Sequence, residues 1–423
     1  MDRLLVTGGT PLDGTVEIAG AKNSALKLMA AVVLADGRST VRNVPRIQDC
    51  FTMVEVLEHL GVGCAWAGDA LVLETTDVRP AETPYELVSR MRASILVLGP
   101  LLARFGNARV AMPGGCNIGS RAIDLHIRGL EKMGARFSSE HGFLVGETTG
   151  LRGAVVNLDF PSVGATENVL MAAVAARGTT VIENAAREPE LVDLADFLVE
   201  MGARIDGVGT PTIEIQGVDG FGAVDHTVIP DRVEAGTYAI AVCSAGGRLV
   251  LSGARADHMD LVLSKLADAG AEVVASDAGV AISMGSRPRC VDLVTLPYPG
   301  FPTDLQPQMM ALLASAEGTS IVTENVFEGR FMFVDELNRM GADIRTEGHH
   351  AVIRGVERLS AAPVRALDIR AGAAMVIAAL TADGVTEIED MYHVDRGYQD
   401  MEAKLAALGA VVRRERERSP ALS

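Results

Sequence analysis

A glycine-rich stretch between residues 111 and 126 brings a thiol and an arginine together. Cys116 follows Gly114-Gly115, and Arg121 comes shortly afterwards. Glycine permits backbone conformations that other residues avoid and lets a loop approach a ligand closely. Four apolar residues lie at helical spacing: Ile123, Ile127, Leu130 and Met133. They place Arg121 at or near the first turn of a helix, where anions are favoured. The pattern predicts an acid or nucleophile beside an anion site, and the alternative is a buried structural cysteine in a turn.

The composition argues against nucleic acid as a partner. The 423-residue chain has a formal net charge of -17, and 4% of its residues are aromatic. Binding to a phosphate backbone needs a basic surface, and stacking on bases needs aromatic side chains. Any anionic substrate must therefore be bound by a local cluster of basic residues.

The cysteines and the apolar segments favour a soluble cytoplasmic protein. The five cysteines form no CxxC pair, which argues against a disulfide framework and against a zinc site. The N-terminus resembles no signal peptide, and the apolar runs 28–35 and 95–103 are far shorter than a membrane span. We find no P-loop and no dinucleotide fingerprint, so we expect no ATP, no NAD, no other cofactor and no metal.

Two glycines recur six times along the chain. One glycine follows an amphipathic helical pattern; the other follows an alanine-rich stretch and precedes a β-like segment. The pattern of each unit therefore predicts a strand, a helix, a turn, a second strand, a second helix, a second turn and further strands, in about 70 residues. The helix-end glycines are Gly61, Gly134, Gly202, Gly270, Gly341 and Gly409, and the strand-start glycines are Gly37, Gly106, Gly178, Gly247, Gly318 and Gly384.

The second unit is longer than the others. Its two glycines, Gly106 and Gly134, lie farther apart in sequence than the two glycines of any other unit. The extra residues fall in the segment that contains Cys116. Extra length in one copy of a regular unit is typical of a functional loop.

Basic residues occur where the first helix of each unit is expected to begin, at a nearly constant distance before its strand-start glycine. Cations oppose the helix dipole at that end, so they destabilise the helix unless an anion binds there. Four cations at equivalent positions of an acidic chain therefore predict an anion-binding site. The six residues are Lys22, Arg92, Ser162, Arg232, Asp304 and Arg370.

These repeats predict an α/β fold of six βαβα-type units, three in each of two domains. The first helix of several units is apolar nearly all round, as in the segment 171–176. Such helices are buried, so we expect them inside each domain with the sheets outside.

The motifs resemble those of one enzyme family from end to end. The chain is similar to the UDP-N-acetylglucosamine 1-carboxyvinyltransferases, a branch of the enolpyruvyl transferases. Motifs that carry the resemblance are Gly20-Ala-Lys22-Asn23, Met91-Arg92, Pro113-Gly-Gly-Cys116-x-Ile-Gly-x-Arg121, Asp124-Leu-His126, Ser162-Val-Gly-Ala-Thr166, Asn184-Ala-Ala-Arg-Glu-Pro-Glu190, Asp231-Arg232, Phe301-Pro-Thr-Asp304, Thr323-Glu-Asn, Asp368-x-Arg370 and His393-x-Asp-Arg396-Gly-Tyr398.

The resemblance implies a fold and a reaction. The fold is a pair of inside-out α/β barrels, here expected at 22–229 and at 1–21 plus 230–423, with the active site in the cleft between them. The reaction transfers enolpyruvate from phosphoenolpyruvate to the 3′-hydroxyl of UDP-N-acetylglucosamine and releases phosphate, through a tetrahedral intermediate. It is the first committed step of peptidoglycan synthesis. No obligate protein partner is implied, and a cysteine-bearing member is expected to be sensitive to fosfomycin.

The resemblance also implies roles for particular residues. Cys116 matches the general acid, and Asp304 matches the general base. Lys22, Arg121 and Arg396 match the clamp for phosphoenolpyruvate, with Asn23 and Cys116 beside it, and Arg232 and Arg370 are secondary candidates. Expected contacts to the UDP-sugar are Asn23, Arg92, Arg121, Ala122, Ile123, Asp124, Leu125, Ser162, Val163, Gly164, Asp304 and Val326. Ala122 departs from the family, in which a proline is common.

Two other functions stay open. An enolpyruvyl transferase acting on another acceptor, such as shikimate 3-phosphate or a nucleoside, would share the fold. A catalytically silent sensor of nucleotide sugars would bind the UDP-sugar without releasing phosphate.

Overall fold

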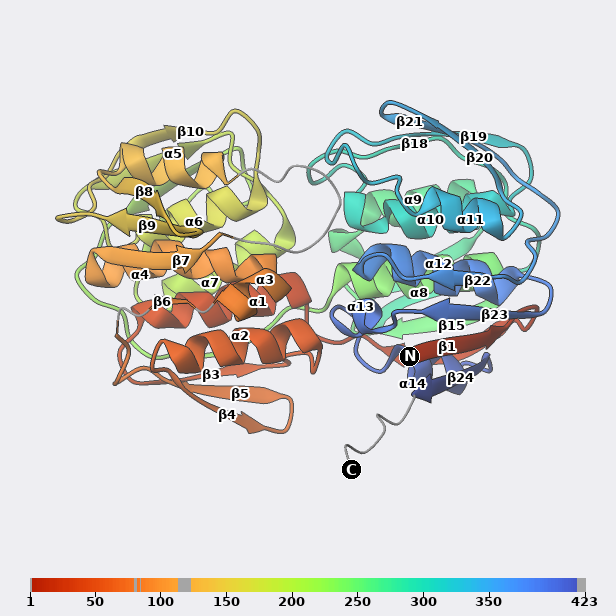
Figure 1. Ribbon diagram of the computed structural model, residues 1–423, viewed down its shortest axis with the longest axis horizontal. Coiled ribbons are helices and arrows are strands. Elements are labelled where there is room, and N and C mark those ends of the chain that lie inside the picture. Colours follow the sequence, from red (N-terminus) through yellow and green to blue (C-terminus); the bar gives the residue numbers. More distant parts are fainter. Residues whose placement is uncertain (1, 80–81, 84, 113–122, 417–423) are drawn as a thin grey trace. The chain divides into compact units, whose positions relative to one another are not determined.

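The computed structural model describes residues 2–79, 82–83, 85–112 and 123–416 (Figure 1). Internal contacts divide these residues into two compact units. Unit 1 contains the described residues of 1–19 and 230–423, and unit 2 contains those of 20–229. Each unit is described by itself below.

Every described strand belongs to one of six four-stranded sheets, and the six sheets repeat one topology. An edge strand pairs in parallel with the second strand, and two further strands add to it in antiparallel pairing, as in the sheet of residues 155–216. The strand at each strand-start glycine is always the second one. The repeated unit predicted from the glycines is therefore confirmed.

Unit 2 contains three of these sheets. The first has the order β14 (Asp225–Thr227), β3 (Arg38–Arg42), β5 (Ala70–Glu74), β4 (Gly63–Ala67); the second has β6 (Glu82–Thr83), β7 (Asn107–Ala111), β9 (Phe143–Glu147), β8 (Arg136–Glu140); the third has β10 (Val155–Asn157), β11 (Thr179–Glu183), β13 (Thr212–Gln216), β12 (Arg204–Asp206).

Unit 1 contains the other three sheets. The first has the order β2 (Leu12–Glu17), β15 (Gly247–Ser252), β17 (Gly279–Met284), β16 (Glu272–Ser276); the second has β18 (Leu293–Val294), β19 (Thr319–Thr323), β21 (His350–Arg354), β20 (Asp343–Glu347); the third has β22 (Pro363–Arg365), β23 (Val385–Glu389), β1 (Asp2–Thr7), β24 (Val411–Arg416).

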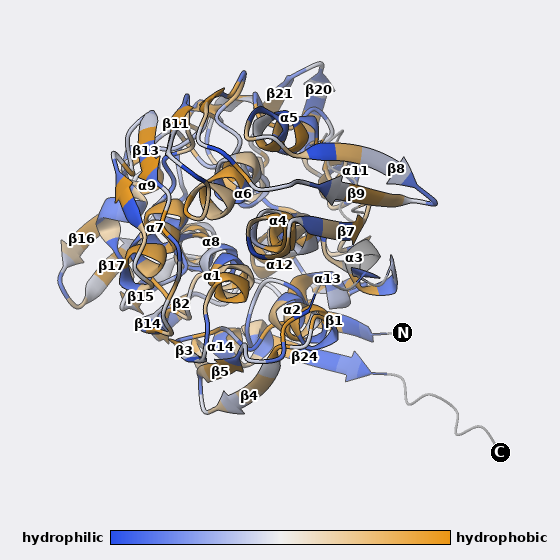
Figure 2. Ribbon diagram, turned by 90° about the vertical axis from the view of Figure 1, so that its left-hand side faces the viewer, coloured by the Kyte–Doolittle hydropathy of each residue, from blue (hydrophilic) through white to orange (hydrophobic). Residues whose placement is uncertain are grey.

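The inner helices of each unit are the apolar helices that the sequence places first in each repeat. Every residue of α10 is buried, and in α12 only the last residue, Thr381, is not. The expectation that these helices lie inside is therefore confirmed. Figure 2 shows α1, α4 and α6 largely in the colour of apolar residues. The inner helices are α1 (Lys22–Ala31) with the 3₁₀ turn η1 (Val32–Leu34), η2 (Arg92–Val97) with α4 (Leu98–Phe105), and α6 (Val163–Ala173) in unit 2, and α8 (Arg232–Ala245), η4 (Thr303–Leu305) with α10 (Gln306–Ala314), and α12 (Ile369–Thr381) in unit 1.

The outer helices are amphipathic and end at the helix-end glycines. These six glycines have φ between 88° and 114°, and the six strand-start glycines have φ between 71° and 112°. Residues with a side chain avoid this left-handed region, which explains why glycine recurs at both places. The outer helices are α2 (Gln48–His59), α5 (Asp124–Lys132) and α7 (Pro189–Glu200) in unit 2, and α9 (Asp260–Asp268), α11 (Val334–Arg339) and α14 (Met401–Ala407) in unit 1; the short helices α3 (Tyr85–Arg90), η3 (Ala256–His258) and α13 (Tyr392–Asp395) complete the described set.

Three strands pair with partners that are distant in the sequence. The parallel partner of β14 is β3, and that of β2 is β15. The N-terminal strand β1 lies between β23 and β24. The chain therefore passes from one unit to the other near residues 20 and 230, and the two passing segments are hydrogen-bonded to each other: Ala21 N–H donates to Ile229 O at 2.7 Å, and Asp231 N–H donates to Ala19 O at 2.8 Å.

A buried histidine lies beside one of these segments in unit 2. His226 on β14 contacts Asp193 through Nε2 at 2.9 Å and Glu200 through Nδ1 at 3.0 Å. The Asp193 carboxylate also accepts hydrogen bonds from the hydroxyl of Ser24 and from the N–H of Ile229. Burial alone would lower the pKa of His226, but the two carboxylates outweigh it and raise the pKa to about 8.

This pKa predicts how stability depends on pH. The folded-state pKa exceeds the ordinary value of 6.5, so the contribution of His226 is complete below about pH 6.5 and is lost as pH rises through about 8. We expect the difference in unfolding free energy between the parent and His226→Gln to shrink over this range. Denaturant unfolding followed by the fluorescence of Trp66, the one tryptophan of the chain, measures it. A difference that stays constant from pH 6 to 9 contradicts the prediction.

Candidate active site

The six residues expected at helix starts are found there. Lys22, Arg92 and Arg232 are the first residues of α1, η2 and α8. Ser162 is the N-cap of α6, Asp304 lies in η4 just before α10, and Arg370 is the second residue of α12. Within unit 1, α8, α10 and α12 all contact one another, and within unit 2, η2 contacts both α1 and α6. In each unit, the repeat therefore brings the starts of three inner helices into one bundle.

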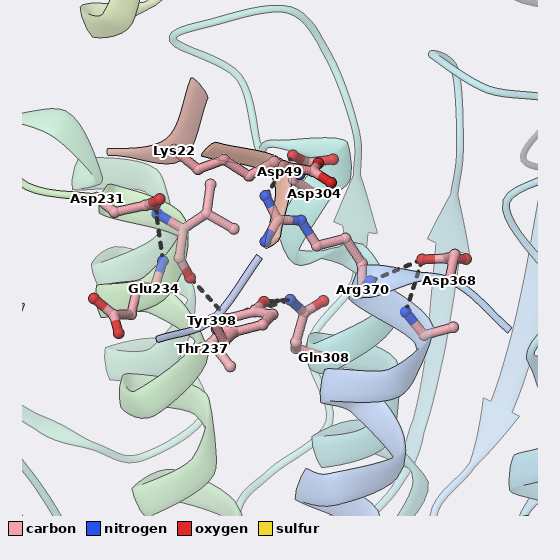
Figure 3. A network of polar contacts seen from close by, with 12 residues as sticks. Lys22, Asp49, Asp231, Glu234, Thr237, Asp304, Gln308, Asp368, Arg370 and Tyr398 are labelled. Carbon is pink, nitrogen blue, oxygen red and sulfur yellow. Dashed lines mark hydrogen bonds and ion pairs between the residues drawn. The ribbon is translucent and has the colours of Figure 1, made fainter. Parts of the chain in front are cut away.

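In unit 1 the Asp304 carboxylate accepts hydrogen bonds from two arginines, of which Figure 3 shows Arg370. Its Oδ1 accepts a hydrogen bond from Arg330 Nη2 at 3.0 Å, and its Oδ2 accepts one from Arg370 Nη2 at 3.0 Å. The side chains of Arg330 and Arg370 are only 1% and 6% exposed, whereas that of Asp304 is 26% exposed. Burial acts to lower the pKa of Arg370, but the interactions with Asp304, Tyr398 and Asp231 together outweigh it and raise the pKa. Two fixed cations therefore lie beside one carboxylate that solvent or a ligand can reach.

The segment that carries Val326 is fixed by a buried glutamate. The carboxylate of Glu324 accepts hydrogen bonds from the N–H groups of Val326 at 2.7 Å and Phe327 at 3.1 Å. Its other oxygen accepts from the hydroxyl of Thr303, the neighbour of Asp304, at 3.0 Å. Glu324 thereby ties the turn to η4, and the turn leads directly to Arg330.

The caps of α8 and α12 are aspartates that precede the basic residues. Asp231 Oδ1 accepts from the N–H groups of Val233 and Glu234, and Asp368 Oδ1 accepts from those of Arg370 and Ala371. These caps satisfy free N–H groups at the helix starts and offset the positive charges there. Two other predicted basic residues are in the same unit: Arg232 lies over the ring of Tyr298 at 5.4 Å, and Arg396 directly follows α13 and is buried.

In unit 2, Lys22 forms a buried ion pair. Its Nζ lies 2.6 Å from Oδ2 of Asp49, the second residue of α2, and the side chains are 9% and 4% exposed. A buried charge without a partner is costly, so the ion pair with Asp49 offsets the cost of burying Lys22 at the start of α1. The neighbouring Asn23 is half-buried.

The start of α6 is covered by a histidine of α5. The Ser162 hydroxyl accepts from Ala165 N–H at 3.3 Å, and the N–H groups of Val163 and Gly164 precede the first intrahelical hydrogen bonds. A Cβ at Gly164 would lie 3.0 Å from Cε1 of His126, so a side chain there would require the ring to shift. Burial and the positive charge of Arg92 lower the pKa of His126 to about 4, so this ring is neutral at pH 7.

The hydrogen bonds of Asn168 fix the tautomer of this ring. Its amide oxygen accepts from Gly99 N–H at 2.8 Å, so its amide nitrogen must donate both to Ile95 O and, at 2.8 Å, to His126 Nδ1. Because Nδ1 accepts, the proton of the neutral ring is on Nε2. His126 therefore carries an N–H beside the first turn of α6.

Three residues predicted for the site, Cys116, Arg121 and Ala122, lie outside the described residues. The next three predicted contacts are described. Ile123 is the buried N-cap of α5, and Asp124 and Leu125 are its first, half-buried residues.

Two charged residues of this site were not predicted from the sequence. Arg330 lies in an irregular turn with no periodic pattern. The one sequence feature that could have drawn attention to it is the apolar run 331–334 that follows it. Asp49 lies in the second helix of the first unit, whereas its partner Lys22 begins the first helix, and no local pattern links the two. Sequence spacing alone finds neither residue.

The described residues hold neither a metal cluster nor a membrane span. Within residues 2–416, apart from the gaps given above, no three or more His, Cys, Asp or Glu side chains are arranged to hold a metal ion. None of the described helices is both long enough and apolar enough to span a bilayer.

Comparison with known proteins identifies the family of the chain. The family model described as EPSP synthase (3-phosphoshikimate 1-carboxyvinyltransferase) matches residues 6–405. The UDP-N-acetylglucosamine 1-carboxyvinyltransferase 2 of Carboxydothermus hydrogenoformans is 52% identical over 416 residues, 98% of this chain and 99% of that protein. The UDP-N-acetylglucosamine 1-carboxyvinyltransferase of Corynebacterium jeikeium is 52% identical over 413 residues, again 98% and 99% of the two chains.

Solved structures share the fold at low sequence identity. The enolpyruvyl transferase NikO from Streptomyces tendae has a TM-score of 0.89 at 24% identity, over 98% of this chain and 99% of that one. An EPSP synthase from Acinetobacter baumannii has a TM-score of 0.76 at 16% identity, over 98% and 100% of the two chains. These structures show the fold, and the family model together with the nearly full-length relatives shows the family. The chain belongs to the enolpyruvyl transferases, the family that includes the UDP-N-acetylglucosamine 1-carboxyvinyltransferases and the EPSP synthases.

Proposed function

We propose that this protein transfers the enolpyruvyl group of phosphoenolpyruvate to the 3′-hydroxyl of UDP-N-acetylglucosamine and releases phosphate. The relatives at 52% identity carry this activity in their names. The observation that carries the proposal is the Asp304 carboxylate, accessible and held between buried Arg330 and Arg370. A base beside fixed cations suits an anionic substrate whose partner hydroxyl must lose a proton.

The proposed chemistry has two stages. In the addition, the 3′-oxygen of the sugar bonds to C2 of phosphoenolpyruvate, Asp304 takes the hydroxyl proton, and the Cys116 thiol protonates C3. In the elimination, the C2–O bond to phosphate breaks, the phosphate leaves with the proton that Asp304 took up, and C3 returns a proton to the Cys116 thiolate, which restores the double bond. Lys22, Arg121 and Arg396 bind the carboxylate and phosphate of the substrate in this scheme. The reaction starts peptidoglycan synthesis, and we place it in the cytoplasm.

Binding of the nucleotide sugar is proposed at the helix starts of unit 2. The free N–H groups of Val163 and Gly164 suit a diphosphate, because helix N-termini favour anions. Arg92, half-buried near His126, adds a positive charge there. The proposed contacts also include Asn23, residues 121–125, Asp304 and Val326.

The test is phosphate release with phosphoenolpyruvate and UDP-N-acetylglucosamine. We expect release only when both substrates are present, and a loss of about 10²- to 10⁴-fold in Cys116→Ala, the usual range for one acid or base. Fosfomycin is expected to abolish the parent activity by alkylating Cys116. Cys64→Ser is the matched control, because burial raises the pKa of the Cys64 thiol to about 12 and makes it a poor nucleophile.

The other outcomes separate the alternatives. Release with shikimate 3-phosphate or a nucleoside, but not with the UDP-sugar, would assign a different acceptor. Binding of the UDP-sugar with no release from any acceptor would make the protein a sensor. Full activity of Cys116→Ala would contradict the role of the thiol.

A further inference from the structure

A buried tyrosine joins the three inner helices of unit 1 beneath Arg370. Tyr398 follows α13 and is 2% exposed. Its hydroxyl lies 2.9 Å from Thr237 Oγ1 on α8 and 3.1 Å from Gln308 Nε2 on α10. Its ring centroid lies 5.4 Å from the guanidinium carbon of Arg370 on α12 (Figure 3).

The direction of each hydrogen bond in this group is determined. The Thr237 hydroxyl donates its proton to Val233 O at 2.7 Å, so toward Tyr398 it can only accept. Tyr398 therefore donates to Thr237, and the Gln308 amide donates to both hydroxyl oxygens, at 3.1 and 3.2 Å. Burial raises the pKa of Tyr398, which keeps the required proton on its hydroxyl. This arrangement of protons satisfies both hydroxyls and the amide nitrogen of Gln308, and it leaves the Gln308 amide oxygen without a hydrogen-bond partner among the described residues.

Arg370 is the charged residue that rests on this group. Its guanidinium donates to Asp304 and lies over the Tyr398 ring. The aromatic face below it favours a cation and restricts the plane of the guanidinium. Tyr398, which is almost fully enclosed by protein, reaches the candidate base through Arg370. The hydrogen bond from Arg370 to Asp304 Oδ2 therefore depends on the guanidinium keeping its position over the Tyr398 ring.

We propose that Tyr398 is a positioning residue for the transfer reaction: its ring, anchored by the hydrogen bonds of its hydroxyl to Thr237 and Gln308, holds Arg370 against the Asp304 carboxylate. This inference rests on the proposed function, in which Asp304 acts as the base. Each of the three helices supplies one member, so the group also fixes the starts of α8, α10 and α12 relative to one another.

Tyr398→Phe tests the proposal, with Tyr238→Phe as a matched control. Tyr238 immediately follows Thr237, is 1% exposed, and its hydroxyl has no hydrogen-bond partner among the described residues. Both variants delete one buried hydroxyl oxygen. We expect kcat of Tyr398→Phe to fall by about 10- to 100-fold, since small displacements of a catalytic group have effects of this size. KM for either substrate should change by less than about threefold, because the enclosed Tyr398 acts through Arg370 and not on the substrates directly.

Two further readouts separate positioning from a general loss of structure. The acid limb of the kcat pH profile should move to higher pH, because a loosened Arg370 stabilises the Asp304 carboxylate less. Arg370 should react faster with a dicarbonyl reagent, read by peptide mass spectrometry, in Tyr398→Phe than in the parent or in Tyr238→Phe. Equal kcat in the two tyrosine variants, or unchanged labelling of Arg370, overturns the proposal.

The labelling measurement also keeps the two proposals distinguishable. If the parent releases no phosphate, the proposed function fails, and the labelling rate of Arg370 alone decides whether Tyr398 holds it. If Tyr398→Phe does not fold, Thr237→Val removes the acceptor for the same hydroxyl and is expected to shift labelling and kcat in the same directions. No change in Thr237→Val then counts against the proposal.

Discussion

Asp304→Asn is expected to lower kcat by about 10²- to 10⁴-fold, the range for loss of a general base. The amide keeps the size and shape of the side chain but cannot take the hydroxyl proton. Affinity for UDP-N-acetylglucosamine, measured by calorimetry, should stay within about tenfold of the parent value, since one neutral contact has replaced a charged one.

The same change should alter stability in a specific way. Arg330 and Arg370 are buried and lose the carboxylate that accepts from both. We expect the free energy of unfolding to fall by about 1–3 kcal/mol, the usual cost of an unsatisfied buried donor. Inorganic phosphate should then raise the melting temperature of Asp304→Asn more than that of the parent, because an anion can replace the carboxylate between the two cations.

Asp383→Asn is the matched control for Asp304→Asn. It makes the same carboxylate-to-amide change in an exposed ion pair with Arg358, where the side chains are 64% and 69% exposed. Such pairs contribute about 0–1 kcal/mol. Parent-like kcat is expected. If Asp304→Asn also keeps parent-like kcat, Asp304 is not the base.

Lys27→Met is expected to cause a large loss of stability in unit 2. Lys27 on α1 and Glu167 on α6 form an ion pair inside the inner helices, and their side chains are 6% and 2% exposed. Removing one partner of a buried pair typically costs about 3–5 kcal/mol, because the other charge is left without compensation. Trp66 fluorescence during denaturant unfolding reports the loss, since Trp66 is in the same unit.

The cost should depend on pH because Glu167 can take up a proton. Burial and the charges of Glu188 and Glu190 raise its pKa to about 7 although Lys27 acts to lower it. For a carboxyl whose folded-state pKa is raised, the contribution to stability is complete below about 4.5 and is lost as pH rises through about 7. Without Lys27 the pKa rises further, so Lys27→Met should be less destabilising at pH 6 than at pH 8.

A double variant tests this explanation. Lys27→Met with Glu167→Met replaces both charges by apolar side chains of similar length, and such replacements are often neutral or stabilising. We expect most of the lost stability to return. The control is Arg42→Met, which breaks an ion pair with Asp225 whose side chains are 52% and 56% exposed, with an expected cost below about 1 kcal/mol. If the double variant is as unstable as Lys27→Met, the unpaired charge is not the cause.

The sequence by itself determined the repeat and the places where cations are concentrated. The glycines mark turns with positive φ, which other residues avoid, so their spacing alone predicted the helix ends and strand starts. Lys22, Arg92, Arg232 and Arg370 lie at helix starts, where the helix dipole disfavours positive charge. Unfavourable charges at a repeated position indicate a functional site, and here they predicted an anion-binding site.

The tertiary structure alone decided which residues face one another. The pairing of β1 with β23 and β24 joins the first strand of the chain to its last two, and no local pattern specifies such a partner. Arg330 reaches Asp304 from an irregular turn, and Tyr398 reaches Arg370 from near the end of the chain. Local periodicity reports which face of an element is buried, whereas the contacts of a buried side chain depend on how separate elements pack. For this reason the candidate base could be predicted from the sequence, but not the way in which Arg330, Arg370 and Tyr398 hold it in place.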